Sequence, residues 1–196
     1  HPEVRFVLCA GDVSDSGDRQ EFEAVQQAFL RSPVPIFTTA GNHDIRDSAL
    51  WAEMFGRHSF HFAFQEVHFT LLDTSSATID PLVFGWLQQW GAAARERDHI
   101  VVSHIPPFDQ PLGARNSSFR SHQEAATYVA ELIEAKVDAA FYGHIHSYAA
   151  FSHGRIPAYI TGGVVPGWHN GIGRHFLIVE FAPESSLRSV DLVHVD

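Results

Sequence analysis

The stretch VRFVLCAGDVSD, residues 4–15, decides the fold. It begins with a short apolar run typical of a buried β-strand and passes through Gly11 directly into an acidic sequence that starts at Asp12. A glycine followed by a polar residue at the end of a strand indicates a tight turn. One such turn is common in any protein, so its meaning depends on whether other strands end in the same way.

Three further apolar runs end in polar clusters. VPIFTTA leads into GNHD at residues 41–44, HIVV leads into SHIPP at residues 103–107, and VDAAFY leads into GHIH at residues 143–146. In an open α/β sheet, ligands bind beyond the carboxyl ends of the strands. We therefore expect these four loops to meet at one edge of a sheet.

The four loops share a set of side chains that bind metals through nitrogen and oxygen. The candidate ligands are Asp12, Asn42, His104, His144 and His146. Carboxylate, amide and imidazole groups without a thiolate suit divalent transition metals better than structural zinc or calcium. On an extended backbone, alternate residues point the same way, so HIH is expected to present both imidazoles to one side and to turn Ile145 into the core.

The chain predicts one α/β domain over residues 1–196. Helical patterns cover residues 18–32, 80–97 and 121–135, and they alternate with the short strands of the first half. The later part reads as strand after strand, which predicts an α/β core finished by an antiparallel sheet. Asp18 or Ser16, Asp80, and Ser121 paired with Glu124 in a capping box are the expected helix starts, and Leu82, Trp86, Leu87 and Trp90 share one helical face.

Composition narrows the possible partners. A formal net charge of −10 disfavours nucleic-acid binding, which needs a basic stripe. There is no apolar run of transmembrane length, so no membrane association is expected. The single Cys9 allows no disulfide within the chain, which leaves the redox compartment open. The location is not determined by the sequence, and a cytoplasmic one is favoured. The sequence does not determine the oligomeric state.

The ordered set GD, GNHD, H and GHIH resembles the calcineurin-like metallophosphoesterases over nearly the whole chain. The resemblance implies a four-layer α/β/β/α sandwich with a dinuclear metal centre at the sheet edge. It implies metal-dependent hydrolysis of phosphomonoester or phosphodiester bonds, with Mn, Fe, Zn or Ni as the two divalent ions and a small phosphate ester as the substrate.

By the same resemblance, Asp12 bridges the two metals, and Asn42, His104 and His144 bind the second. His146 binds the first. His43 is the catalytic histidine beside the leaving-group oxygen, and Asp44 orients it.

One part of the family pattern differs. The family signature opens with D-x-H on a first strand, and no D-x-H precedes Asp12 in this sequence. Three explanations stay open: an N-terminally truncated chain whose first strand is missing, a one-metal or degenerate form, and a strand supplied by another segment or chain. The first is favoured, because losing that strand leaves unpaired backbone groups at an apolar edge.

Three functions follow from these alternatives. The chain is expected to be a phosphoesterase. A catalytically impaired fragment or binding scaffold of the same fold is the second reading, and a nuclease is disfavoured by the acidic charge. Two loops carry candidate substrate contacts, which are Arg115, Asn116, Arg120, Trp168, His169 and Asn170.

Overall fold

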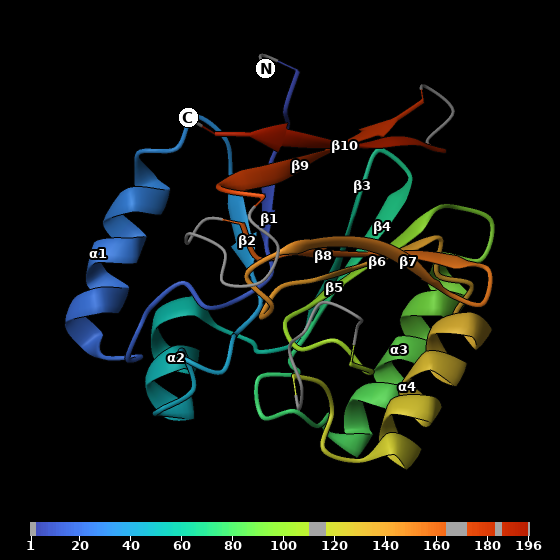
Figure 1. Cartoon of the computed structure of the whole chain (residues 1–196), viewed down its shortest axis with the longest axis horizontal. Helices are drawn as coiled ribbons and strands as arrows, with labels where there is room; N and C mark the ends of the chain where they lie inside the picture. The colour runs from blue at the N-terminus through green and yellow to red at the C-terminus, as the bar shows by residue number, and fades with distance from the viewer. Residues whose placement is uncertain (1–2, 110–116, 164–171, 183–185, 196) are drawn as a thin grey trace.

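A computed structural model of the chain describes residues 3–109, 117–163, 172–182 and 186–195 (Figure 1). Within these residues, short strands alternate with helices until β6, and strands follow one another after it. The helices are α1 (Arg19–Leu30), α2 (Ser48–Phe55), α3 (Pro81–Ala93) and α4 (His122–Glu134). The strands are β1 (Val7–Cys9), β2 (Ile36–Thr38), β3 (Phe60–Phe64), β4 (Val67–Leu72), β5 (His99–Ser103), β6 (Ala139–Tyr142), β7 (Tyr148–His153), β8 (Ile156–Thr161), β9 (His175–Phe181) and β10 (Leu187–His194).

The strands form three hydrogen-bonded groups. The largest has the order β3-β4-β5-β6-β8-β7, with its four inner strands parallel and its two outer strands antiparallel to their neighbours. Strands β1 and β2 form a parallel pair, and β9 and β10 form an antiparallel pair. The predicted antiparallel ending is confirmed for the pair β9 and β10 and for the pair β7 and β8, although β8 also pairs in parallel with β6.

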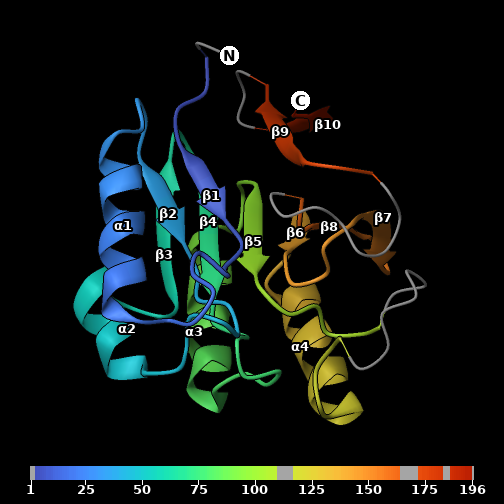
Figure 2. The ribbon, with the colours of Figure 1, turned by 60° about the vertical axis from the view of Figure 1, so that its left-hand side comes forward.

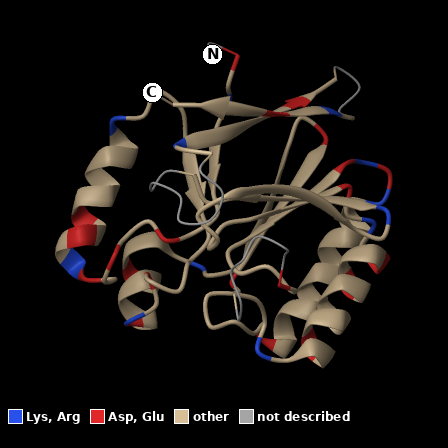
Figure 3. Ribbon diagram, in the orientation of Figure 1, with Lys and Arg blue, Asp and Glu red and all other residues tan. Residues whose placement is uncertain are grey.

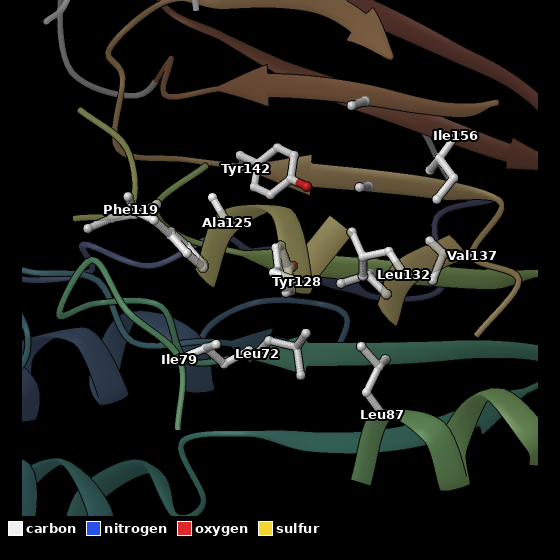
Figure 4. Close-up of a cluster of buried hydrophobic side chains, with 14 of the residues drawn as sticks. Leu72, Ile79, Leu87, Phe119, Ala125, Tyr128, Leu132, Val137, Tyr142 and Ile156 are labelled. Atoms are coloured by element: carbon white, nitrogen blue, oxygen red, sulfur yellow. The ribbon is translucent and has the colours of Figure 1, made fainter. Parts of the chain in front are cut away.

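The layers follow from which face each cluster of apolar side chains covers. One cluster includes Phe69, Val102 and Phe141 of the six-stranded sheet and packs against apolar residues of both two-stranded pairs, such as Phe37 and Val179. The opposite face packs against α3 and α4 (Figure 4). Helices α1 and α2 lie outside the β1–β2 pair (Figure 2). This arrangement is the expected α/β/β/α sandwich.

The helices start at the expected capping residues. The carboxylates of Asp18 and Asp80 and the hydroxyl of Ser121 each accept a hydrogen bond from a backbone N–H of the first turn. The predicted capping box is only half formed. The Glu124 carboxylate does not close it at Ser121 but accepts a hydrogen bond of 2.9 Å from the Ile79 N–H. The start of α4 is therefore tied to the loop that precedes α3.

The buried face of α3 matches the predicted one only in part, because Leu87 and Trp90 pack inward and the other two residues do not. Leu82 and Trp86 are 68% and 40% exposed, while Val83, Leu87 and Gly91 are buried. A Cβ atom at Gly91 would lie 2.6 Å from the Ala135 Cβ, so this glycine allows α3 to approach α4 closely. The contact between helices, rather than the size of the aromatic side chains, selects the buried face.

Charged residues are spread over the outside of the sandwich. Lysines and arginines are interspersed with acidic residues on the ribbon (Figure 3). No described helix is both long enough and apolar enough to cross a membrane.

Candidate metal centre

Four loops bring the expected ligands to one edge of the sandwich. Asp12 follows β1, Asn42 follows β2, His104 follows β5 directly, and His144 follows β6. The loops contact one another closely: the Gly143 N–H donates to the His104 carbonyl oxygen over 3.0 Å. The predicted meeting of the four loops is confirmed.

His104 is the centre of this arrangement. Its Nδ1 lies 2.6 Å from the carbonyl oxygen of Ala10, and because a carbonyl can only accept, Nδ1 carries the proton. Nε2 lies 3.1 Å from Oδ2 of Asp12 and 3.0 Å from Oδ1 of Asn42. A neutral His104 would therefore direct a lone pair at two oxygen acceptors. A proton or a cation between these three atoms would make the contact favourable.

His144 completes the group. One ligand atom from each of Asp12, His104 and His144 lies within 4.8 Å of the others, and this is the one such group of at least three His, Cys, Asp or Glu side chains among the described residues. The rings of His104 and His144 are nearly perpendicular, with centroids 5.1 Å apart. The His104 side chain is 1% exposed and that of Asp12 is 18% exposed, so the site is shielded but reachable. Nitrogen and oxygen donors in this arrangement fit a divalent transition metal.

The backbone is strained at two of these residues. Asp12 has φ 52° and His144 has φ 62°, in the left-handed region that L-residues rarely occupy. Such strain costs on the order of 1–3 kcal/mol per residue and clusters at functional sites. A Cβ atom at Gly41 would lie 2.1 Å from Oδ1 of Asp12, so only glycine leaves room for this carboxylate.

The pKa shifts of Asp12 and His144 favour the protonation states in which these side chains can bind a metal ion. Burial acts to raise the pKa of Asp12, but contacts with His104 and the His43 backbone N–H outweigh it, and the net pKa is lowered. Burial, followed by the neighbouring His104, lowers the pKa of His144 to about 4. At neutral pH the site thus offers an ionised carboxylate and a neutral His144 imidazole.

His43 lies beside the group and not in it. Its backbone N–H donates to Oδ1 of Asp12 over 3.0 Å, and its Nδ1 lies 2.8 Å from the Asp15 carbonyl oxygen, to which it donates. That hydrogen bond raises the pKa of the His43 imidazole, against a smaller effect of partial burial. With Nδ1 taken and the side chain 49% exposed, Nε2 is the nitrogen left for a ligand.

Asp44 makes different contacts from those expected. Its fully buried carboxylate accepts hydrogen bonds from the N–H groups of Val13, Ser14 and Gly41 and from the Ser14 hydroxyl, at 2.7–3.3 Å. The partner of the His43 ring is instead the Asp15 carbonyl oxygen. Asp44 therefore joins the loop after β1 to the loop after β2. A backbone carbonyl has no sequence signal, which is why pattern alone missed this partner.

The HIH segment is not extended as predicted. It forms two successive three-residue turns, in which the N–H of Ile145 donates to the Gly143 carbonyl and the N–H of Ser147 donates to the Ile145 carbonyl, each over 2.6 Å. Ile145 is buried, as expected. His144 reaches the three-residue group, whereas His146 is outside it but close enough to influence the pKa of His144.

The proposed substrate loops are described only in part. Arg120, just before α4, is exposed, and its backbone N–H donates to the carbonyl oxygen of Ala77 in the loop before α3. The other candidates lie outside the described residues: Arg115, Asn116, Trp168, His169 and Asn170.

The fold is a four-layer sandwich, and a group of nitrogen and oxygen donors that could hold a metal ion lies at its edge. The family profile for calcineurin-like phosphoesterases matches residues 1–148. The chain belongs to the calcineurin-like phosphoesterase family.

Solved structures share this fold at low sequence identity. The purple acid phosphatase PPD1 from yellow lupin (Lupinus luteus) seeds has a TM-score of 0.66 and 15% identity, covering 82% of this chain and 37% of that protein. GAP50, titled the anchor in the inner membrane complex of Plasmodium, has a TM-score of 0.64 and 14% identity, covering 86% and 66%. PhoD has a TM-score of 0.62 and 10% identity, covering 95% and 62%. The chain thus spans between 37% and 66% of the length of these three proteins. No curated protein shows a significant sequence match.

Proposed function

We propose that this protein is a metal-dependent phosphoesterase that hydrolyses phosphomonoester or phosphodiester bonds at a dinuclear centre. The observation that carries the proposal is the position of His104 Nε2, about equally far from the carboxylate of Asp12 and the amide oxygen of Asn42, with the His144 imidazole beside them. Three inward-facing acceptors at these distances would form a site for a cation.

The ligands divide between two ions. Asp12 would contact both, since its carboxylate has two oxygens and one of them faces His104. Asn42, His104 and His144 would hold one ion, and His146 would contribute to the other. Divalent transition metals such as Mn, Fe, Zn or Ni would offset the charge of a phosphoryl group and supply a water of lowered pKa for in-line attack.

His43 would act on the leaving group. The Asp15 carbonyl holds the proton on Nδ1, so the ring is oriented and Nε2 can carry a second proton. The raised pKa of His43 favours this protonated form. From there Nε2 can donate its proton to the leaving oxygen as the ester bond breaks, and a general acid of this kind typically contributes about 10²–10⁴ in rate.

The ion held by Asp12 and His146 needs further ligands. Among the described residues β1 pairs with β2 alone, so the other edge of β1 can accept a strand. We propose that a strand carrying D-x-H lies along that edge and supplies the remaining donors beside Asp12.

A scaffold role is the alternative. The similar fold of the Plasmodium protein titled an anchor shows that this sandwich also occurs in a protein named for attachment. A scaffold does not need strained ligands, so the left-handed backbone of Asp12 and His144 favours the enzyme.

Metal content and hydrolysis test the proposal together. Metal-free protein is loaded with Mn²⁺ or Zn²⁺, and the hydrolysis of p-nitrophenyl phosphate and of bis-p-nitrophenyl phosphate is followed. We expect metal-dependent turnover that His104→Ala abolishes together with the bound metal, while His122→Ala, on the exposed side of α4, changes neither. Full metal content in His104→Ala would contradict the ligand assignment. Bound metal without turnover of either ester, both in this chain and in one extended by a D-x-H strand, would favour the scaffold. Two tightly bound ions per chain without that strand would contradict the need for it.

A further inference from the structure

A second group of histidines lies at the opposite end of β5 from the metal centre. His61, His68 and His99 come from β3, β4 and β5, which are neighbours in the sheet, and all three rings lie on the face covered by α3 and α4. Trp90 of α3 stacks on the His61 ring with centroids 5.6 Å apart and an interplanar angle of 11°. His99 is fully buried, while His61 and His68 are half-buried.

The three rings are joined by a chain of hydrogen bonds that fixes the protons. The Ala135 carbonyl accepts from Nδ1 of His99 over 3.4 Å, so Nε2 of His99 is an acceptor. The Thr70 hydroxyl, 2.8 Å away, donates to that nitrogen. The same hydroxyl oxygen, 3.1 Å from Nδ1 of His61, then accepts from this ring. Nε2 of His61 is thereby left with a lone pair.

That lone pair faces His68. Nε2 of His61 lies 3.1 Å from Nδ1 of His68, and the ring centroids are 5.1 Å apart. Without a metal, His68 donates the proton in this contact. When His68 carries its proton on Nε2 instead, both facing nitrogens offer a lone pair to a metal ion. Binding the ion then only moves the His68 proton from one ring nitrogen to the other and releases none. A separation of this size is close to that between two imidazole nitrogens bound to one ion at about 2.0–2.1 Å.

We propose that Nε2 of His61 and Nδ1 of His68 form a second, exchangeable site for a divalent transition metal such as Zn²⁺, Ni²⁺ or Cu²⁺, separate from the proposed catalytic centre. Two neutral imidazoles in this position are the ligands that these ions prefer, and water can complete the coordination because His68 is half-buried. Thr70 and Trp90 fix the orientation of the His61 ring. A hydrogen-bonded outer partner of this kind is usual behind a metal-binding histidine.

Burial keeps the three rings neutral. Burial lowers the pKa of His61 and of His68, and it lowers the pKa of His99 to about 4. Glu66 and Arg97, which form an ion pair of 2.6 Å, act on His68 in opposite directions. On the other side, the Asp138 carboxylate accepts from the His99 backbone N–H. At neutral pH the rings are therefore neutral and can bind a metal ion. At lower pH, protons compete with the metal for the same nitrogen atoms.

Zinc titration of three proteins tests the site. Metal-free wild type, His68→Ala and the surface control His122→Ala are titrated with Zn²⁺ by calorimetry. We expect His68→Ala to bind one equivalent less than wild type with unchanged phosphoesterase activity, and His122→Ala to match wild type. The same zinc stoichiometry in His68→Ala and wild type would overturn the proposal, and equal losses in both variants would show adventitious binding to surface histidines.

Imidazole ¹⁵N spectra add a readout that does not depend on the first centre. Zinc should move the His68 proton from Nδ1 to Nε2 and shift the signals of both His61 and His68. Removing the hydroxyl in Thr70→Val should weaken zinc binding at this site about 10- to 100-fold, and Thr70→Ser should restore it. Signals of His61 and His68 that stay unchanged at saturating zinc would show that the contact is only a hydrogen bond.

Discussion

Asp12 and His104 face each other from two different sheets, with Oδ2 of the carboxylate 3.1 Å from Nε2 of the imidazole. Asp12 follows β1 of the two-stranded pair, and His104 follows β5 of the six-stranded sheet. The proton on Nδ1 of His104 is held by the Ala10 carbonyl, next to Gly11 and Asp12 in the chain. The turn after β1 therefore carries one proposed ligand and also orients another.

Gly41→Ala should remove the metal. The new Cβ would lie 2.1 Å from Oδ1 and 2.2 Å from the backbone nitrogen of Asp12, so both the carboxylate and the turn after β1 have to move. We expect metal affinity and turnover each to fall at least about tenfold, as measured by metal content after gel filtration and by ester hydrolysis. Gly85→Ala is the matched control, because a Cβ there meets nothing within 4 Å and alanine favours the helix. Normal metal content in Gly41→Ala would contradict the position assigned to Asp12.

His43→Ala should slow hydrolysis by about 10²–10⁴ and leave metal binding intact. The contact of His43 with Asp12 is made by the backbone N–H, which alanine retains. The measurement is turnover of a phosphomonoester with a poor leaving group, beside metal content. Asp15→Ala is the control: the side chain is 93% exposed and the carbonyl that orients His43 is kept, so turnover should change only a few-fold. A loss of metal in His43→Ala would show that His43 is a ligand.

Asp44→Asn should destabilise the protein by about 2–3 kcal/mol, as measured by urea unfolding. The buried carboxylate accepts four hydrogen bonds, and an amide cannot accept all of them because its NH₂ group would face other donors. Asp47→Asn at the start of α2 is the control, since asparagine caps a helix as well as aspartate. Equal stability of the two variants would show that the Asp44 contacts contribute little to folding.

The free energy of unfolding should decrease as pH falls, because His99 is buried as a neutral imidazole. In the unfolded chain its pKa is about 6.5, and burial lowers it to about 4 in the folded protein. Between these values the unfolded state binds the extra proton, so the free energy of unfolding decreases as pH falls, by about 1.4 kcal/mol per pH unit from this group. His99→Gln should make the slope of unfolding free energy against pH shallower by that amount between pH 6 and pH 4.5. His122→Gln, which leaves the histidine cluster untouched, is the control, and identical slopes for His99→Gln and wild type would refute the assignment.

Much of the architecture could be predicted from local signals. Apolar runs that end in glycine located β1, β2 and β6, and the polar residues after them located the site, because parallel strands end at a common edge. Helix starts followed from single capping residues such as Asp18 and Asp80. These features depend on a few neighbouring residues, so the sequence pattern is sufficient to find them.

Other features depend on contacts between distant segments. The buried face of α3 is set by the close approach of Gly91 to Ala135 at the end of α4. The partner of the His43 ring is the carbonyl oxygen of Asp15. The turns at His144 replace the extended backbone that alternation suggested. None of these contacts leaves a pattern in the residues that make it, so the sequence could place the side chains at the site but not orient them.

The proposed ligands come from two different sheets, and this affects the stability of the protein. A cation that binds Asp12 and Asn42 on one side and His104 and His144 on the other would fasten the two halves of the sandwich together. An ion present at 100 times its dissociation constant adds about 2.7 kcal/mol to the stability of a protein that binds it only when folded. Chelation would then loosen the seam between the sheets, and the temperature of unfolding would report on the centre even in a variant that has lost all turnover.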